Sequence, residues 1–142
     1  MRFQYWPAVG TFDSRGKLVK RPILELELIG EKGASISTIG VVDSGADTTT
    51  LNIQFAKALN IKLEESKTKE IIGIGDGKVK VYLGKIRFKI KHTEEEIEVP
   101  AWYVDSDNVN FLIGQEVFFD TYRIKFEKDH DSFEIVSSRR GR

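Results

Sequence analysis

Apolar and polar side chains alternate along many short segments of this chain, a pattern typical of β-strands that bury one face. Residues 23–29 give the clearest example, because isoleucine and leucine alternate there with glutamate. Further strands are expected at residues 36–42, 69–72, 78–83, 97–104, 123–126 and 133–136, with hairpin turns near residues 11–18 and 129–131. Many short strands at regular spacing predict a small, closed, all-β architecture.

Two short helices are expected between these strands. The first has apolar residues at helical spacing, at Leu51, Phe55 and Leu59. The threonines at residues 48–50 offer hydroxyl caps for its start, and Asn60 suits the left-handed conformation in which many helices end. The second helix is expected over residues 115–122, directly after Gly114.

The buried face changes along the predicted strand that begins at residue 78. Apolar side chains occupy odd positions up to Leu83 and even positions from Ile86 onward. Because side chains alternate between the two faces of a strand, this change predicts a bulge or a bend at Gly84.

Composition narrows the possible classes of protein. With 142 residues, 40% hydrophobic and 31% charged, the chain is expected to form one domain, with a core over about residues 18–136 and a flexible tail at 137–142. Acidic and basic side chains balance at 22 each, so no overall field favours nucleic acid or an anionic membrane. No apolar run approaches the ~20 residues of a membrane span, and a soluble cytoplasmic protein is therefore expected.

Cysteine is absent, which excludes thiol catalysis, disulfides and thiolate metal sites. His92 and His130 stand alone in charged segments and are interpreted as surface residues, so no metal site is expected. Residues 105–110 lack the ligand pattern of a calcium loop and are interpreted as a polar turn. The glycine-rich segment at residues 73–78 lacks the spacing of a phosphate-binding loop, which argues against nucleotide binding.

Three features that carry chemistry occur in a fixed order. The first follows an apolar strand and consists of Asp43, Ser44, Gly45, Ala46 and Asp47. The second is a glycine-rich tip between two strands, formed by Ile72, Gly73, Ile74, Gly75, Asp76 and Gly77. The third is an apolar run that ends in glycine, at Phe111, Leu112, Ile113 and Gly114. An aspartate delivered by a strand onto a tight turn is well placed for chemistry, but hydrolysis of a peptide bond by carboxylates alone needs two of them.

This order resembles the retroviral-type (retropepsin-like) aspartic proteases over roughly residues 23–126. The resemblance implies a closed, mainly antiparallel barrel with one lobe per chain, and a symmetric homodimer that brings together two copies of Asp43. It also implies an aspartic endopeptidase that cleaves extended polypeptide substrates with no metal or cofactor. Asp43 on a buried strand is expected to be desolvated, which opposes ionisation. Two such carboxylates also repel one another and retain one proton between them, the state for which aspartic proteases are the standard example.

The resemblance also implies roles for the neighbouring residues. The Ser44 hydroxyl bonds across the dimer axis, Gly45 lets the backbone approach the substrate, Ala46 keeps the floor of the cleft narrow, and Asp47 receives the substrate backbone. Residues 72–77 form the flap over the cleft, and residues 112–114 form a supporting loop. One departure stands out, because many viral members place an arginine where this chain has Gln115, and that arginine pairs with the equivalent of Asp47. Asp47 must therefore find another partner or stay solvated.

Two alternatives remain open from the sequence. A retropepsin fold can serve as a catalytically silent dimerisation or peptide-binding module. A monomeric β-barrel of unrelated function is the third interpretation, and it predicts no self-association. The aromatic residues Trp102, Tyr103, Phe118 and Phe119 are interpreted as core or dimer contacts, since no basic groove accompanies them.

Overall fold

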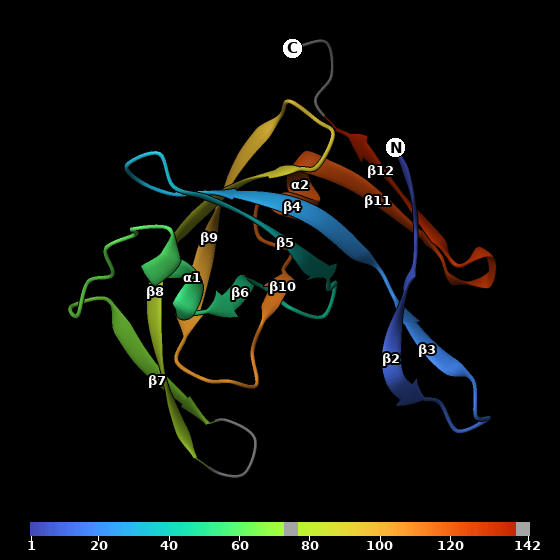
Figure 1. Ribbon diagram of the computed structural model, residues 1–142, viewed down its shortest axis with the longest axis horizontal. Helices are drawn as coiled ribbons and strands as arrows, with labels where there is room; N and C mark the ends of the chain where they lie inside the picture. Colours follow the sequence, from blue (N-terminus) through green and yellow to red (C-terminus); the bar gives the residue numbers. More distant parts are fainter. Residues whose placement is uncertain (73–76, 139–142) are drawn as a thin grey trace.

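Six strands close into a β-barrel in the computed structural model, which describes residues 1–72 and 77–138 (Figure 1). Around the barrel the order is β4 (Ile23–Ile29), β5 (Ser35–Val42), β10 (Phe111–Ile113), β6 (Thr49–Asn52), β9 (Glu96–Val104) and β8 (Lys78–Ile90). Pairing between β8 and β4 closes the ring, and β7 (Thr68–Ile72) continues the sheet beyond β8. The β5–β10 and β6–β9 pairs are parallel and the other pairs antiparallel, so the predicted closed, mainly antiparallel barrel is confirmed.

Three smaller parts adjoin the barrel. Strands β1 (Arg2–Gln4), β12 (Ser132–Ser137) and β11 (Tyr122–Glu127) form a second sheet, with the turn η1 (Lys128–His130) between β11 and β12. Strands β2 (Trp6–Phe12) and β3 (Leu18–Arg21) form a separate hairpin that projects from the barrel (Figure 1). The helices are α1 (Gln54–Ala58) and α2 (Phe118–Thr121). No helix in the described part of the chain is long and apolar enough to cross a membrane.

The core follows directly from the alternating pattern of the sequence. In β4, Leu24, Leu26 and Leu28 are buried while the glutamates between them are exposed, as predicted. Aromatic rings fill the centre, where Phe88 stacks on Phe118 at 5.9 Å between ring centroids. Each fully buried leucine or phenylalanine stabilises the fold by roughly 1.5–3 kcal/mol, so this core fixes the positions of the loops around it.

The helix predictions need two corrections. The threonines at 49–50 do not cap α1, because they lie within β6, and α1 instead begins after Ile53 with no side-chain cap. The second helix covers only α2, since Val117 has a positive φ of 69° that a continuous right-handed helix cannot contain. The prediction for Asn60 is confirmed, because it ends the first helix with φ of 57°.

The prediction of a bulge at Gly84 is wrong, and the alternative of a bend there stays a prediction. Strand β8 pairs with β9 without a register shift, from Val81 opposite Val104 to Lys89 opposite Glu96. Gly84 lies on the barrel face of β8, where an added Cβ would be 3.3 Å from the Tyr103 ring. The parity change therefore has another cause: Val81 and Val104 are buried together outside the main core cluster, on the opposite face of the sheet.

The two ends of the described chain meet in the second sheet. The Phe3 ring stacks on Phe133 with centroids 5.4 Å apart, so the packed structure includes residues N-terminal to the predicted core. The Ser138 hydroxyl donates hydrogen bonds to the carbonyls of Asp120 and Thr121. The rest of the predicted tail, residues 139–142, lies outside the described residues.

Candidate active site

Asp43 follows the last residue of β5, and strand β10 holds it in place. The Asp43 backbone N–H donates to the Ile113 carbonyl over 2.9 Å. The parallel register places Leu112 beside Val41 and Ile113 beside Val42, so residues 43–47 and the predicted supporting loop lie together. The fold thus brings together the first and third sequence features, which stand about seventy residues apart.

The Asp43 carboxylate is oriented by its own turn. One of its oxygens, Oδ1, accepts a hydrogen bond from the Gly45 N–H at 2.9 Å, while the Asp43 carbonyl accepts one from Ala46 at 3.2 Å. Among the described residues, the second oxygen, Oδ2, has no hydrogen-bond or ion-pair partner. One carboxylate oxygen is therefore used for positioning, and the other remains available to a water molecule or a second chain.

The expected burial of Asp43 is not present in the single chain. Val42 is buried, but Asp43 is only half-buried, and Ser44 and Gly45 are exposed. The reason is that the strand ends at Val42 and the aspartate lies at the start of the turn. Any stronger desolvation of the carboxylate must come from a substrate or from a second chain packed against this face.

Gly114 is required by the backbone that surrounds it. A Cβ at this position would lie 2.4 Å from the Thr48 carbonyl carbon and 2.7 Å from the Thr49 nitrogen. This close approach lets the Gly114 N–H donate to the Thr49 hydroxyl at 3.1 Å. Thr49 is fully buried (0% exposed), so its hydroxyl satisfies an amide that water cannot reach. Sequence analysis assigned Thr49 to a helix cap and missed this role.

Gln115 stabilises the active-site loop in a different way from the arginine of viral members. Its side-chain amide donates to the Ser44 carbonyl, and its backbone N–H donates to the Ala46 carbonyl at 2.8 Å. The next residue, Glu116, donates its N–H to the Asp47 carbonyl at 2.8 Å. Gln115 therefore donates to the backbone of the loop and makes no hydrogen bond to the Asp47 carboxylate.

Asp47 is exposed, and no described cation lies within ion-pair distance of its carboxylate. Of the two possibilities left by the sequence, the structure shows solvated Asp47. It lines a depression together with Thr48, Gln115, Glu116, Phe119 and Asp120. Three carboxylates and one aromatic ring thus lie side by side next to the candidate site.

Strands β7 and β8 form the hairpin that the sequence predicts to carry the flap. Their last described pair is Ile72 with Lys78, and the Ile72 side chain is 79% exposed. Residues 73–76 lie outside the described residues, so the tip of the flap stays a prediction. The described ends of the hairpin make no hydrogen bond to residues 43–47.

A cross-strand network braces the base of this hairpin, and sequence analysis missed it. The Glu65 carboxylate accepts hydrogen bonds from Lys80 at 2.7 Å and from the Tyr82 hydroxyl at 2.8 Å. These two donors lower the pKa of Glu65 below its ordinary value. On the neighbouring strands, the Lys69 ammonium lies 3.4 Å from the centre of the Trp102 ring. No local pattern reveals such contacts, because the partners meet only through strand pairing.

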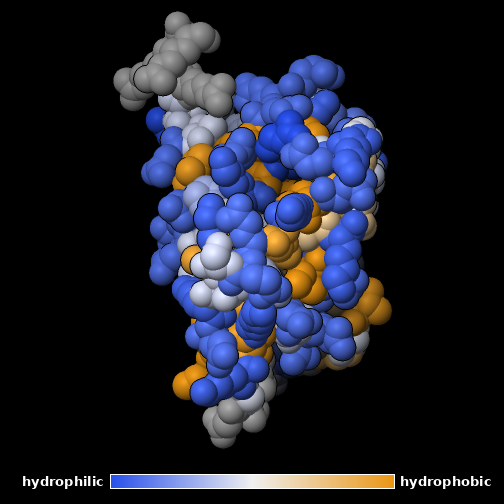
Figure 2. Space-filling view, turned by 90° about the vertical axis from the view of Figure 1, so that its left-hand side faces the viewer, coloured by the Kyte–Doolittle hydropathy of each residue, from blue (hydrophilic) through white to orange (hydrophobic). Residues whose placement is uncertain are grey.

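A second hollow lies away from Asp43, between residues 61–67 and β8. Its apolar lining comes from Ile61, Leu63, Leu83 and Ile86. The face of the molecule on the β7 and α1 side is mostly hydrophilic, with hydrophobic side chains visible in a strip between the charged ones (Figure 2). Within the described residues, no group of histidine, aspartate and glutamate side chains is arranged to hold a metal ion.

The closed barrel and the Asp43 turn supported by β10 define a retropepsin-like aspartic protease fold. The sequence signature of the family described as "gag-polyprotein putative aspartyl protease" matches residues 34–119, more than half of the chain. The chain belongs to this family of aspartyl proteases.

Solved structures agree on the fold. The retropepsin-like aspartic protease from Rickettsia conorii superposes with a TM-score of 0.56 at 14% identity, over 96% of this chain and 98% of that chain. The retroviral protease-like domain of Ddi1 from Leishmania major superposes with a TM-score of 0.55 at 14% identity, over 80% of this chain and 87% of that one. Comparison with curated proteins returns no match.

Proposed function

We propose that this protein is an aspartic endopeptidase that acts as a homodimer on extended polypeptide substrates. The observation that carries the proposal is the Asp43 turn, in which Gly45 fixes one carboxylate oxygen and leaves the other available. The chain contains one Asp-Ser-Gly element, and water activation by carboxylates needs an acid and a base together. A two-fold axis supplies the second Asp43 with the same geometry.

In this mechanism the two Asp43 carboxylates share one proton and hold a water molecule between them. The ionised carboxylate accepts a proton from the water as the water oxygen attacks the carbonyl carbon of the peptide bond. The protonated carboxyl gives its proton to the carbonyl oxygen, which forms a tetrahedral diol. The carboxyl that took the water proton then gives a proton to the amide nitrogen, and the other carboxylate takes a proton from one diol hydroxyl as the C–N bond breaks. The products are an amine and a carboxylic acid, and one proton stays on the Asp43 pair.

The remaining site residues take supporting roles. Ser44 and Gly45 present the loop backbone at the axis, and Ala46 and Asp47 line the cleft next to the substrate. Leu112, Ile113 and Gly114 hold this loop through the contacts of β10. Residues 72–77 close over the extended peptide, whose backbone pairs with the flap as an added strand. We also propose that residues 1–142 act as one domain, which the pairing of β1 with β12 supports.

A silent dimerisation or peptide-binding module is the second candidate, and the Gln115 departure favours it. Without an arginine at that position, Asp47 has no described cationic partner, and the subsite differs from that of viral members. Retention of an oriented Asp43 favours catalysis, because peptide binding alone gives no reason to fix the carboxylate by the Gly45 amide.

Cleavage of an unstructured protein substrate, followed by mass spectrometry from acidic to neutral pH, separates the two candidates. We expect products from the wild type and from Asp107→Asn, a matched change in an exposed turn, and none from Asp43→Asn. Turnover retained by a folded Asp43→Asn protein contradicts the proposal. Peptide binding by both wild type and Asp43→Asn, with no product from either, establishes the silent module instead.

A further inference from the structure

The β2–β3 hairpin exposes apolar side chains of the kind that protein interfaces bury. It forms a two-stranded sheet that pairs with no other described strand and projects from the barrel (Figure 1). Val9 is 91% exposed and Phe12 is 63% exposed, and Trp6 and Leu18 are also exposed. An isolated hairpin is at best marginally stable in water, and clustered exposed apolar side chains mark contact surfaces. The single chain therefore leaves these apolar side chains without a cover.

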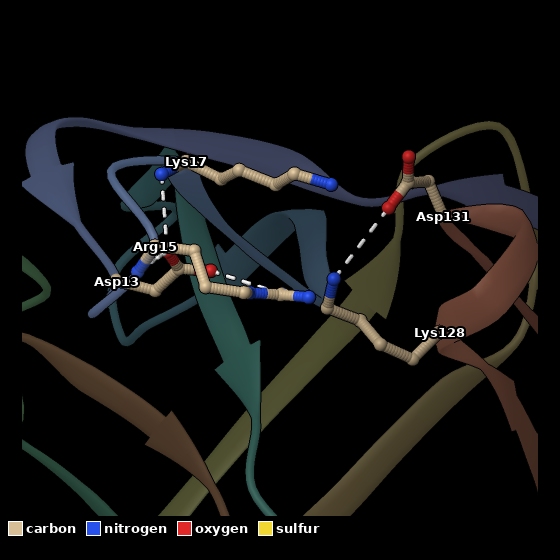
Figure 3. Close-up of polar contacts among 5 residues, drawn as sticks. All are labelled: Asp13, Arg15, Lys17, Lys128 and Asp131. Atoms are coloured by element: carbon tan, nitrogen blue, oxygen red, sulfur yellow. Dashed lines mark hydrogen bonds and ion pairs between the residues drawn. The ribbon is translucent and has the colours of Figure 1, made fainter.

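The tip of the hairpin is ordered without such a cover. The Asp13 carboxylate accepts hydrogen bonds from the backbone N–H groups of Arg15 at 2.8 Å and Lys17 at 3.0 Å. Figure 3 shows the Arg15 and Lys17 side chains extended toward the turn that carries Lys128 and Asp131. A fixed turn of this kind presents the hairpin as a preformed element, which reduces the ordering cost of an association.

Polar contacts link the side of the hairpin to its own chain, where Ala8 and Val19 are also half-buried. Lys20 pairs with Asp131 at 2.9 Å, and Lys128 lies 3.6 Å from the same carboxylate. The groups in these pairs are about half exposed, and ion pairs of this kind contribute little to stability. Of these two pairs, the one between Lys20 and Asp131 links the hairpin to the η1 turn, and the exposed apolar side chains stay uncovered.

The base of the hairpin lies beside the catalytic turn. The Pro22 carbonyl accepts a hydrogen bond from Val42, the residue before Asp43, at 2.8 Å, and Ile23 pairs with Val41. In the proposed dimer the two Asp43 turns meet at the two-fold axis, so the hairpins start next to that axis. The seven residues of β2 span roughly 20 Å, which is long enough to reach onto a second chain.

Charge also favours a second copy as the occupant. The hairpin carries four basic residues against the single acid Asp13. Arg15 pairs with Asp13 and Lys20 with Asp131, which leaves Lys17 and Arg21 without an ion-pair partner among the described residues. The depression beside the active-site loop carries Asp47, Glu116 and Asp120, none of which has an ion-pair partner among the described residues. Complementary charges on one chain fit the reciprocal contacts that a two-fold dimer requires.

We propose that the β2–β3 hairpin is a dimerisation arm that lies on a second copy of this chain. Val9 and Phe12 pack on the partner, and the basic side chains of Lys17 and Arg21 lie against the partner's acidic depression next to its active-site loop. The family signature begins at residue 34, so this arm lies outside the residues that the signature matches. The inference rests on the proposed homodimer and assigns the residues that hold it together.

Sedimentation equilibrium of the full chain tests the arm. We expect the combined change Val9→Glu and Phe12→Glu to weaken the dimer at least about tenfold, while Leu83→Glu, an exposed apolar residue of β8, leaves it unchanged. Circular dichroism checks that both variants fold. If the hairpin variant leaves the dissociation constant of the dimer unchanged, the arm is overturned but the proposed protease dimer is not. If the dissociation constant is unchanged and KM rises, the substrate is the occupant of the hairpin instead. A wild type that stays monomeric overturns both the arm and the dimer.

Cross-linking gives an independent test, because the chain contains no cysteine. A Val9→Cys protein is mixed with a Glu116→Cys protein and treated with a short bifunctional thiol reagent. We expect a cross-linked heterodimer from this pair, and much less when Glu116→Cys is replaced by Glu94→Cys in the exposed β8–β9 turn. If the yield of heterodimer is the same with Glu116→Cys and with Glu94→Cys, the chains are cross-linked by random collision. That result overturns the proposed placement of the arm.

Discussion

The backbone N–H of Gly114 donates a hydrogen bond to the buried hydroxyl of Thr49 over 3.1 Å. This contact joins β6 to the end of β10, immediately before Gln115 binds the backbone of the Asp43 turn. The orientation of the candidate catalytic carboxylate thus depends on a threonine outside the sequence motif.

Thr49→Val tests this contact with little change in shape. The substitution leaves a buried N–H without an acceptor, so we expect it to lower the free energy of unfolding by about 1–3 kcal/mol. Thr49→Ser retains the hydroxyl and serves as the control. Urea denaturation measures both, and equal stability of the valine and serine variants would show that the hydrogen bond contributes nothing.

Gly114→Ala tests the close approach of the two loops. Its Cβ would lie within 2.4 Å of the Thr48 backbone, which cannot move without displacing β6. We expect a loss of about 1–3 kcal/mol or more in the free energy of unfolding. Gly77→Ala is the control for stability, since no atom of the described residues lies within 4 Å of a Cβ there. If Gly114→Ala has the same melting temperature as the wild type, the described packing is contradicted.

Gln115→Leu removes the side-chain donor to the Ser44 carbonyl while keeping the side-chain volume similar. Because the loop then holds Asp43 less firmly, we expect kcat on a peptide substrate to fall about tenfold, as small misplacements of catalytic groups do. Gln54→Leu, at an exposed glutamine of α1, is the matched control. An unchanged kcat in a folded Gln115→Leu protein shows that the glutamine does not position the site.

Ionisation of Tyr103 lowers the stability of the fold at alkaline pH. Burial raises the pKa of Tyr103 well above its ordinary value, and its hydroxyl donates to the Lys85 carbonyl at 2.6 Å. Because the folded pKa is the higher one, this stabilisation is fully present below the unfolded pKa of about 10 and is lost as the pH rises above it.

Tyr103→Phe measures this effect by denaturation at several pH values. At neutral pH we expect the variant to be less stable than the wild type by about 1 kcal/mol, the contribution of one hydrogen bond. The difference in stability narrows as the pH rises from about 10 to about 11, because Tyr103 of the wild type releases its proton on unfolding and phenylalanine has none to release. A difference that stays constant over this range contradicts the burial of the hydroxyl.

Much of the fold could be predicted because local patterns and tertiary packing agree. The alternating leucines and glutamates of β4 gave the bounds Ile23–Ile29, and the Asp-Ser-Gly and apolar-Gly elements indicated which loops meet. Predictions failed where strand pairing overrode local preference. Residues 49–50 look like helix caps in isolation, but pairing with β9 and β10 draws them into β6.

Other features carry no local signal at all. The hydrogen bond from Gly114 to Thr49, the contact of Gln115 with Ser44 and the brace at Glu65 each join segments that are distant in sequence. The positive φ of Val117 also follows from the tight connection after β10, because a β-branched residue does not favour that conformation.

The most direct test of the central account is the activity of mixed dimers. Wild type and Asp43→Asn chains are combined in equal amounts, allowed to exchange, and compared with wild type at the same total concentration. If each site needs one Asp43 from each chain, activity falls to about one quarter, since only dimers of two wild-type chains remain active. Activity of about one half means that each chain works alone, and it contradicts a site shared between two copies of Asp43.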